Sequence, residues 1–241
     1  MRIVTISDKH FGVQNRLESQ LESACIPYLH FSIPQFTWRK KLLAELEIAK
    51  AFPGTVLIYV DPWDVQLQAE AQDLLNLRSE GFFDRPVFPA DCGCWPDEEK
   101  SPLFPPTQTA WRYINGGAPS GLGRDIAAAI EYGLSKYGPP GNTADLFEPF
   151  GTDQRFYTSL FLDYHKQGKG RLDSDTRLQM ALCGAYPRKD YDTPGDKIVN
   201  VVSGYAPIFV HANGTSMFPT TKYLARKTAD HLVHNIDRQA V

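Results

Sequence analysis

Apolar residues are spaced along the chain in patterns that predict strands and helices in alternation. A short β-branched segment at residues 2–6 predicts a buried first strand, and Leu17 and Leu21 follow it at helical spacing. Apolar positions recur every three or four residues over 38–49, which predicts an amphipathic helix. The continuous apolar run at 55–60 has the pattern of a strand that is covered on both faces.

The same patterns continue over the rest of the chain. We expect a helix over 65–77, a short strand at 86–89 and an irregular loop over 91–108, where proline and acidic residues are frequent. The second half predicts extended segments at 111–114 and 207–211 and helices at 126–137, 152–165 and about 221–236, with Thr152 as the N-cap of the helix at 152–165. Strands and helices that alternate in this way predict an α/β sandwich around a mainly parallel central sheet.

We expect a single domain over residues 1–241, because no repeat and no long linker divides the chain. In open α/β sheets, ligands bind beyond the carboxyl ends of the strands. The polar residues that directly follow apolar runs are therefore the candidates for a functional site.

The composition is that of an ordinary globular domain. The 241 residues are 42% hydrophobic and 12% aromatic, which excludes a disordered chain, and the formal net charge of -3 gives no bulk positive field for nucleic acid. No stretch approaches the roughly 18 uninterrupted apolar residues of a membrane span. The first residues lack a secretory cleavage site, and the 4 cysteines lack the spacing of a disulfide framework or a zinc site. We therefore expect a cytoplasmic protein with reduced thiols and no membrane partner.

Two carboxylates follow the most hydrophobic strand of the sequence. Asp61 and Asp64 stand within one tight turn, where a ligand of the sheet is expected. Their hard anionic oxygens suit a divalent cation such as Mn²⁺ or Mg²⁺, which could bridge to a diphosphate. The alternative is structural: Asp64 would cap a helix that starts near Val65, and Asp61 would be a turn residue.

A histidine ends the late strand in a similar way. His211 could complete a metal site through a neutral imidazole, and the amides around Asn213 and Gly214 could bind phosphate oxygens. The alternative is a histidine with only a structural role.

Other polar positions are compatible with both a site and a plain structural role. Gly116, after Asn115, would let the backbone approach a ligand closely, although a simple turn explains it equally well. Asp153 lies in the first turn of a predicted helix, where the helix dipole favours an acid whether or not it is catalytic. Asp91 could border a pocket.

Several common catalytic motifs are absent from the sequence. It has no Walker A loop, no dinucleotide fingerprint, no Gly-x-Ser-x-Gly elbow and no His-Glu-x-x-His helix. P-loop nucleotide hydrolysis, hydride transfer and serine-hydrolase chemistry are therefore disfavoured.

The order of the motifs resembles a known family. In succession they are Val-Asp61-Pro-Trp-Asp64, Phe88-Pro-Ala-Asp91, Cys94-Trp-Pro-Asp97, Ile114-Asn-Gly-Gly, Asp153-Gln-Arg-Phe-Tyr-Thr and His211-Ala-Asn-Gly. This series resembles the glycosyltransferase domain of the multifunctional procollagen lysyl hydroxylases and related procollagen glycosyltransferases, from the first strand to about residue 214. The resemblance implies a GT-A fold, with a Rossmann-like mixed sheet flanked by helices. It also implies transfer of a hexose from a UDP-sugar with a divalent metal, usually Mn²⁺.

The resemblance also implies roles for individual residues. The metal ligands would be Asp61, Asp64 and His211, and the catalytic acid on the sugar or acceptor side would be Asp153. The UDP-sugar would contact Lys41, Asp61, Trp63, Asp91, Asn115, Gly116, Asn213 and Gly214. The nucleotide-binding part would span about 1–110, and the sugar and acceptor part about 111–241.

The implied donor is UDP-glucose or UDP-galactose, and the implied outcome is retention at the anomeric carbon. The acceptor stays open between a protein, a glycan and a modified nucleic-acid base. The sequence departs from the family at Thr152, where the collagen enzymes have a further acid, and at Ala212, which replaces glycine. Two alternatives follow: a nucleotide-sugar or glycan-binding module with a decayed site, and a metal-dependent phosphoesterase.

Overall fold

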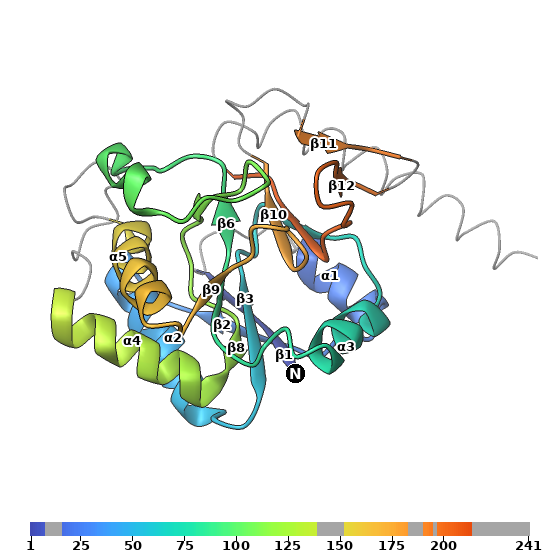
Figure 1. The fold of residues 1–241 in the computed structure, drawn as a ribbon. Helices are drawn as coiled ribbons and strands as arrows, with labels where there is room; N and C mark the ends of the chain where they lie inside the picture. Colours follow the sequence, from blue (N-terminus) through green and yellow to red (C-terminus); the bar gives the residue numbers. More distant parts are fainter. Residues whose placement is uncertain (8–15, 139–151, 183–189, 195–196, 214–241) are drawn as a thin grey trace, which may run out of the picture.

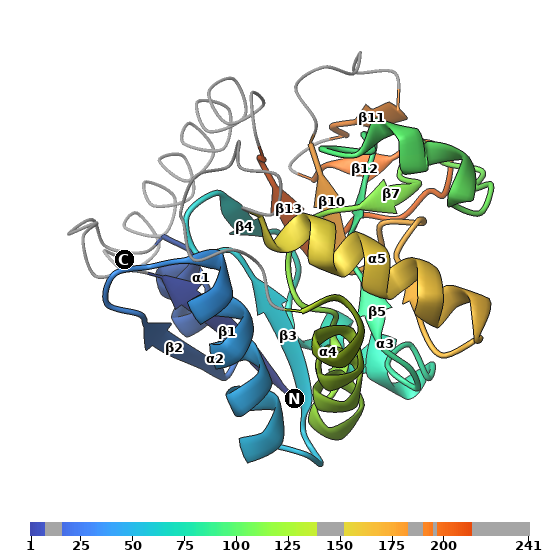
Figure 2. The same cartoon turned by 90° about the vertical axis from the view of Figure 1, so that its left-hand side faces the viewer.

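The computed structural model describes residues 1–7, 16–138, 152–182, 190–194 and 197–213. A four-stranded and a five-stranded sheet lie between two layers of helices (Figures 1 and 2). One layer contains α2 (Trp38–Ala51), α4 (Gly123–Tyr137) and α5 (Asp153–Lys166), and the other contains α1 (Arg16–Ser23) and α3 (Ala71–Ser79). The predicted α/β sandwich is therefore confirmed.

The first sheet has the strand order β2, β1, β3, β8. These strands are β2 (Tyr28–Ser32), β1 (Arg2–Ser7), β3 (Val56–Val60) and β8 (Gly121–Leu122). The strand β1 runs parallel to β2 and β3, whereas β8 is antiparallel to β3. Val4 packs into the core under α2 and α4, and its neighbour Ile3 packs into the core under α1 and α3. Burial on both faces explains why these strands read as continuous apolar runs.

The second sheet is mixed and has the order β4, β13, β10, β6, β7. Its strands are β4 (Val65–Leu67), β13 (Phe209–His211), β10 (Gln179–Ala181), β6 (Ala90–Asp91) and β7 (Tyr113–Ile114). The strand β10 is parallel to both of its neighbours, and the edge strands β4 and β7 are antiparallel. Two further ladders pair β11 (Tyr191–Asp192) with β12 (Val199–Asn200) and β5 (Val87–Phe88) with β9 (Arg171–Leu172).

The expected helix over 65–77 is wrong in its first part. Val65 and Leu67 are buried on either side of Gln66, which is the period of a strand, and β4 pairs with β13. The helix α3 begins only at Ala71, after the N-cap Glu70. Asp64 therefore caps no helix there.

Three other expectations concern the loop over 91–108, the N-cap Thr152 and the last helix. The predicted loop over 91–108 contains a 3-10 helix, η1 (Glu98–Leu103). Thr152 occupies the N-cap position of α5, yet its buried hydroxyl has no hydrogen-bond partner among the described residues. The expected helix at about 221–236 lies outside the described residues.

Helices α2 and α4 pack closely because α4 begins with a glycine. A Cβ on Gly123 would lie 2.3 Å from the carbonyl oxygen of Phe52 and 2.6 Å from that of Ala49.

Among the residues that the structure describes, no helix has both the length and the apolar character that crossing a membrane requires.

Candidate functional site

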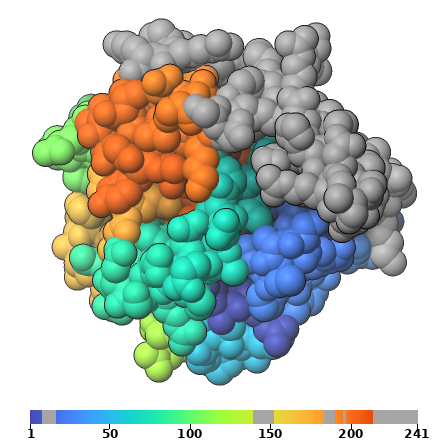
Figure 3. All heavy atoms as spheres, turned by 90° about the vertical axis from the view of Figure 1, so that its right-hand side faces the viewer, coloured from blue at the N-terminus to red at the C-terminus, as the bar shows by residue number. Residues whose placement is uncertain are grey.

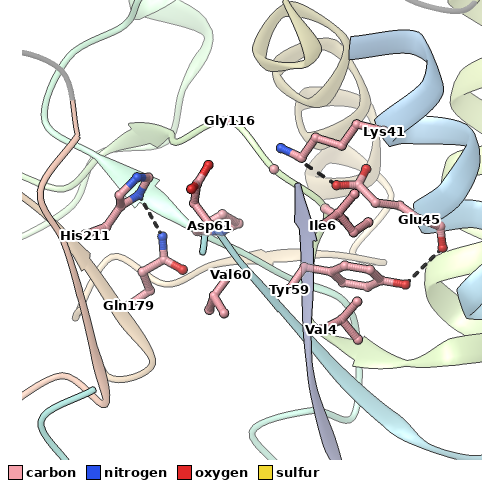
Figure 4. A pocket seen from close by; sticks show the side chains of 13 residues that line it. Val4, Ile6, Lys41, Glu45, Tyr59, Val60, Asp61, Gly116, Gln179 and His211 are labelled. Carbon is pink, nitrogen blue, oxygen red and sulfur yellow. Dashed lines mark hydrogen bonds and ion pairs between the residues drawn. The ribbon is translucent and has the colours of Figure 1, made fainter. Parts of the chain in front are cut away.

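The polar residues that follow the strands gather at one edge of the fold around a pocket. Asp61 follows β3, His211 ends β13, and Lys41 reaches the same pocket from α2. Asp61 lies between His211 and Lys41 (Figure 4). The pocket has a volume of about 30 Å³, close to that of one water molecule. It can therefore form only the inner end of a site for a larger ligand.

Strand pairing brings Asp64 and His211 together. Because β4 and β13 are antiparallel with His211 opposite Val65, Asp64 lies beside the end of β13. The backbone N–H of Ala212 donates to the Asp64 carbonyl at 2.8 Å, and His211 Nε2 lies 3.0 Å from Asp64 Oδ1. The strand that replaced the expected helix is thus what joins these two predicted site residues.

The other ring nitrogen of His211 is held by a chain of buried amides and a carboxylate. His211 Nδ1 lies 3.0 Å from Asn115 Oδ1, and Asn115 Nδ2 donates to Asp91 Oδ2 at 2.9 Å. Since a carboxylate only accepts, the Asp91 contact fixes the Asn115 amide with its oxygen toward the ring, so Nδ1 carries a proton. Asn213 Nδ2 donates to the same Asp91 oxygen at 2.8 Å.

The ionisable side chains at this edge of the fold shift one another's pKa values. Burial alone would lower the pKa of His211, but Asp64 and then Asp61 raise it above its ordinary value. Burial opposes ionisation of Asp64, yet His211 brings the pKa of Asp64 below its ordinary value. Burial and the neighbouring Asp64 raise the pKa of Asp61. Below its raised pKa, His211 is an imidazolium that the neighbouring Asp64 and Asp61 stabilise.

The donor set suits a divalent metal, although it is not arranged as a finished site. Carboxylate oxygens are common ligands of Mn²⁺ and Mg²⁺, whereas an imidazole nitrogen suits a transition metal better than Mg²⁺. Asp64 Oδ1 is buried and accepts no well-aligned hydrogen bond, and His211 holds its Nδ1 proton away from it, toward Asn115. Asp61 Oδ1 accepts the Trp63 N–H at 3.0 Å. Within the described ranges, no group of three or more acidic, histidine or cysteine side chains is preassembled to hold a metal ion.

A second charged cluster lies on the other side of Asp61. Lys41 Nζ lies 2.7 Å from Asp153 Oδ2 and 3.9 Å from Glu45 Oε1. The Glu45 and Asp153 side chains are 1% and 4% exposed, so both are shielded from solvent. Burial would lower the pKa of Lys41, but Asp153 and Glu45 raise it above its ordinary value. Lys41 therefore stays charged inside the protein.

The structure also places the remaining predicted residues. Gly116 lines the pocket, and a Cβ there would lie 3.2 Å from Asp153 Oδ1, which explains the need for a small residue. Trp63 is 40% exposed beside Asp61. Asp91 and Asn115 are buried behind His211 and are absent from the pocket lining. Gly214 lies outside the described residues.

Sequence reasoning missed several residues of the pocket, among them Gln179 and Glu45. Gln179 lines it from β10, and its side-chain Nε2 lies 3.1 Å from His211 Nδ1 (Figure 4). A proton on Nδ1 requires the Gln179 amide to turn its oxygen toward the ring, which a flip of the amide provides. Glu45 lines it from α2. The available signals were a glutamine within the apolar stretch 178–182 and an acid on the apolar face of a helix.

A second hollow lies away from this site. It has a volume of about 230 Å³ and lies between α3 and residues 197–208, on the face shown in Figure 3. None of the predicted site residues lines it.

Comparisons with known proteins indicate the family of the chain. A family model described as "PLOD GT domain" matches residues 39–231. A Caenorhabditis elegans "multifunctional procollagen lysine hydroxylase and glycosyltransferase" is 26% identical over 179 residues, which cover 71% of this chain and 23% of that protein. A Drosophila melanogaster "procollagen-lysine,2-oxoglutarate 5-dioxygenase" is 27% identical over 178 residues, with the same coverage of 71% and 23%.

A viral protein extends the comparison. An uncharacterized protein of Acanthamoeba polyphaga mimivirus is 25% identical over 198 residues, which cover 82% of this chain and 38% of that protein. The chain spans about a quarter of the length of the two animal relatives. The mixed sheet between helical layers is consistent with a GT-A domain. Because the family model matches most of its length, the chain belongs to the PLOD glycosyltransferase-domain family.

Proposed function

We propose that this chain transfers a hexose, glucose or galactose, from a UDP-sugar to an acceptor and that it requires a divalent metal. The observation that carries the proposal is the meeting of Asp61, Asp64 and His211 beside the pocket at the ends of β3 and β13. Family membership supports glycosyl transfer as the reaction class.

In this proposal, Asp61, Asp64 and the Nε2 atom of His211 hold Mn²⁺ or Mg²⁺. Bound metal supplies positive charge that stabilises the UDP leaving group. The Asn115 amide keeps the Nδ1 proton of His211 in place, which leaves Nε2 as the ligand atom once its own proton is lost. Trp63, exposed beside Asp61, offers an aromatic surface for the nucleotide.

The sugar would lie at the Lys41 side of the pocket. Gly116 removes the Cβ that would fill this space, and Asp153 stands behind it, ion-paired with Lys41. We assign Asp153 the role of orienting the sugar or the acceptor and of stabilising positive charge at the anomeric carbon. Lys41 would in turn contact the donor phosphate or the sugar.

The test is UDP release from several UDP-sugars, with and without Mn²⁺, by the wild type and by Asp64→Ala. We expect metal-dependent release that the substitution abolishes. Asp175→Ala is a matched control, because Asp175 is exposed and remote from the described site, and it should retain wild-type activity.

The same assay separates the alternatives. UDP binding without turnover on any donor would favour a binding module, and hydrolysis of simple phosphoesters would favour a phosphoesterase. Retention is also part of the proposal, and an NMR spectrum of the product showing inversion would refute that part. The acceptor, whether protein, glycan or modified nucleic-acid base, and the cytoplasmic location stay predictions.

A further inference from the structure

Glu45 is a buried acid to which the proposed donor site assigns no role. It lies one helical turn after Lys41 on α2, and its side chain is 1% exposed. Its neighbours on the buried face of α2 are Leu42, Leu46 and Ala49. An ionised carboxylate in such surroundings is costly unless several partners satisfy it.

The partners of Glu45 come from three different parts of the fold. Oε1 lies 3.9 Å from Lys41 Nζ, and Oε2 accepts the Tyr157 hydroxyl of α5 at 2.5 Å. The backbone N–H of Ala118, in the segment that follows the glycines of the pocket, also donates to the carboxylate. The Tyr59 hydroxyl of β3 donates to the Glu45 carbonyl at 2.9 Å.

These contacts fix the position of Glu45. Lys41 does not need Glu45 for the neutralisation of its charge. Asp153, at 2.7 Å, already neutralises Lys41. The Glu45 carboxylate, 3.9 Å from Lys41 Nζ, instead adds a second negative charge that attracts the ammonium, and Lys41 is directed toward the pocket (Figure 4). Through Tyr157, the same carboxylate is tied to α5, the helix that begins with Asp153.

We propose that Glu45 is a positioning residue, which holds the Lys41 ammonium and, through Lys41 and Tyr157, the Asp153 carboxylate at the inner end of the donor pocket. This proposal rests on the proposed function, because it assigns the positioned pair to the sugar end of that site. Tyr157 acts with Glu45, since its hydroxyl fixes the carboxylate oxygen that faces away from Lys41.

The first measurement compares kcat and KM for UDP release in the wild type, Glu45→Gln and Tyr157→Phe, well below each unfolding midpoint and at a pH above 7, where Glu45 is ionised. Glutamine keeps an oxygen that can accept from Tyr157 and removes the charge that holds Lys41. We expect Glu45→Gln to lower kcat by about ten- to a hundredfold, and Tyr157→Phe to lower it by less. Donor KM should change less than kcat, because Glu45 makes no hydrogen bond or ion pair to Asp61, Asp64 or His211 among the described residues and reaches the donor only through Lys41.

The matched control is Glu47→Gln on the same helix. Glu47 is 73% exposed and pairs only with Lys50 among the described residues, at 3.7 Å, so its variant should keep wild-type kcat. An unchanged kcat in Glu45→Gln, or a loss fully explained by a smaller folded fraction, would overturn the positioning role.

A second measurement is independent of turnover. Hydrogen exchange of the Lys41 ammonium with water, followed by lysine-selective NMR, should be severalfold faster in Glu45→Gln than in the wild type and Glu47→Gln. Equal exchange rates would refute the proposal. If the wild type releases no UDP from any donor, the proposed function fails, and this exchange measurement alone decides the role of Glu45.

Discussion

His211 Nε2 lies 3.0 Å from Asp64 Oδ1, across the antiparallel pair formed by β4 and β13. The ring carries its other proton toward Asn115, so below the raised pKa of His211 the contact with Asp64 is made by an imidazolium. A bound divalent cation would take over the charge of that imidazolium. Metal binding at this site is therefore coupled to the loss of one proton.

This coupling predicts that Mn²⁺ affinity rises with pH. Asp64 and Asp61 raise the pKa of His211, so below that pKa the metal must displace a proton, and above it the imidazole is already neutral. Affinity should increase by about tenfold per pH unit on the acidic side and then level off. Calorimetry across pH would show this, and a flat profile would contradict it. His165→Gln, at an exposed histidine of α5, should leave the profile unchanged.

The side-chain amide of Asn115, buried behind His211, leads to a second prediction. Asn115→Ala removes the acceptor for the Nδ1 proton and leaves Asp91 without one of its donors. Mn²⁺ affinity should fall by roughly ten- to a hundredfold, as it does when outer partners of metal ligands are lost. Titration with Mn²⁺ measures the change. Asn76→Ala, at an exposed asparagine of α3, is the control, and equal affinities in the two variants would contradict the role of Asn115.

The raised pKa of Glu45 predicts that part of the free energy of unfolding decreases as pH rises. Burial raises the pKa of Glu45 from 4.5 to about 7, so the folded protein holds this proton more tightly than the unfolded chain. The contribution of this proton to the stability of the folded protein is complete below about pH 4.5 and is lost as pH rises through about 7. The loss is on the order of 3 kcal/mol.

Urea unfolding of the wild type and Glu45→Gln across this pH range tests that component, because Glu45 is the only titrating residue that differs between the two proteins. The difference in unfolding free energy should shift in favour of Glu45→Gln as pH rises. A difference that is independent of pH would exclude a raised pKa at Glu45.

Local patterns were sufficient for the layers of the fold and for the acids at the strand ends. The continuous burial of β1 and β3 and the amphipathic face of α2 are both visible in the sequence. The strand β4 was missed because three residues are too few to distinguish strand from helix by periodicity. Pairing with β13, in which His211 lies opposite Val65 although it is 146 positions later in the chain (211 − 65), decides the state of β4, and no local signal encodes that contact.

The same limit applies to the candidate site. Asp61, Asp64 and His211 were predicted because each follows an apolar run, and the fold brings them to one edge. Asp91 and Asn115 were expected to contact the donor, whereas the structure buries both behind His211. Their distance from the pocket depends on the register of β6 and β7, which the residue types do not specify.

The close packing of α2 against α4 gives a last prediction. Gly123→Ala would place a Cβ 2.3 Å from the Phe52 carbonyl oxygen and 2.6 Å from that of Ala49. Both obstacles are backbone atoms, so one helix must move, and overpacking of this kind costs about 1–3 kcal/mol. Because α2 carries Lys41 and Glu45, the displacement should also lower UDP release at temperatures where the variant is folded. Gly54→Ala is the matched control, since a Cβ there would meet no atom within 4 Å. Chemical denaturation should show a stability loss for Gly123→Ala alone, and equal stabilities of the two variants would contradict this account of the helix contact.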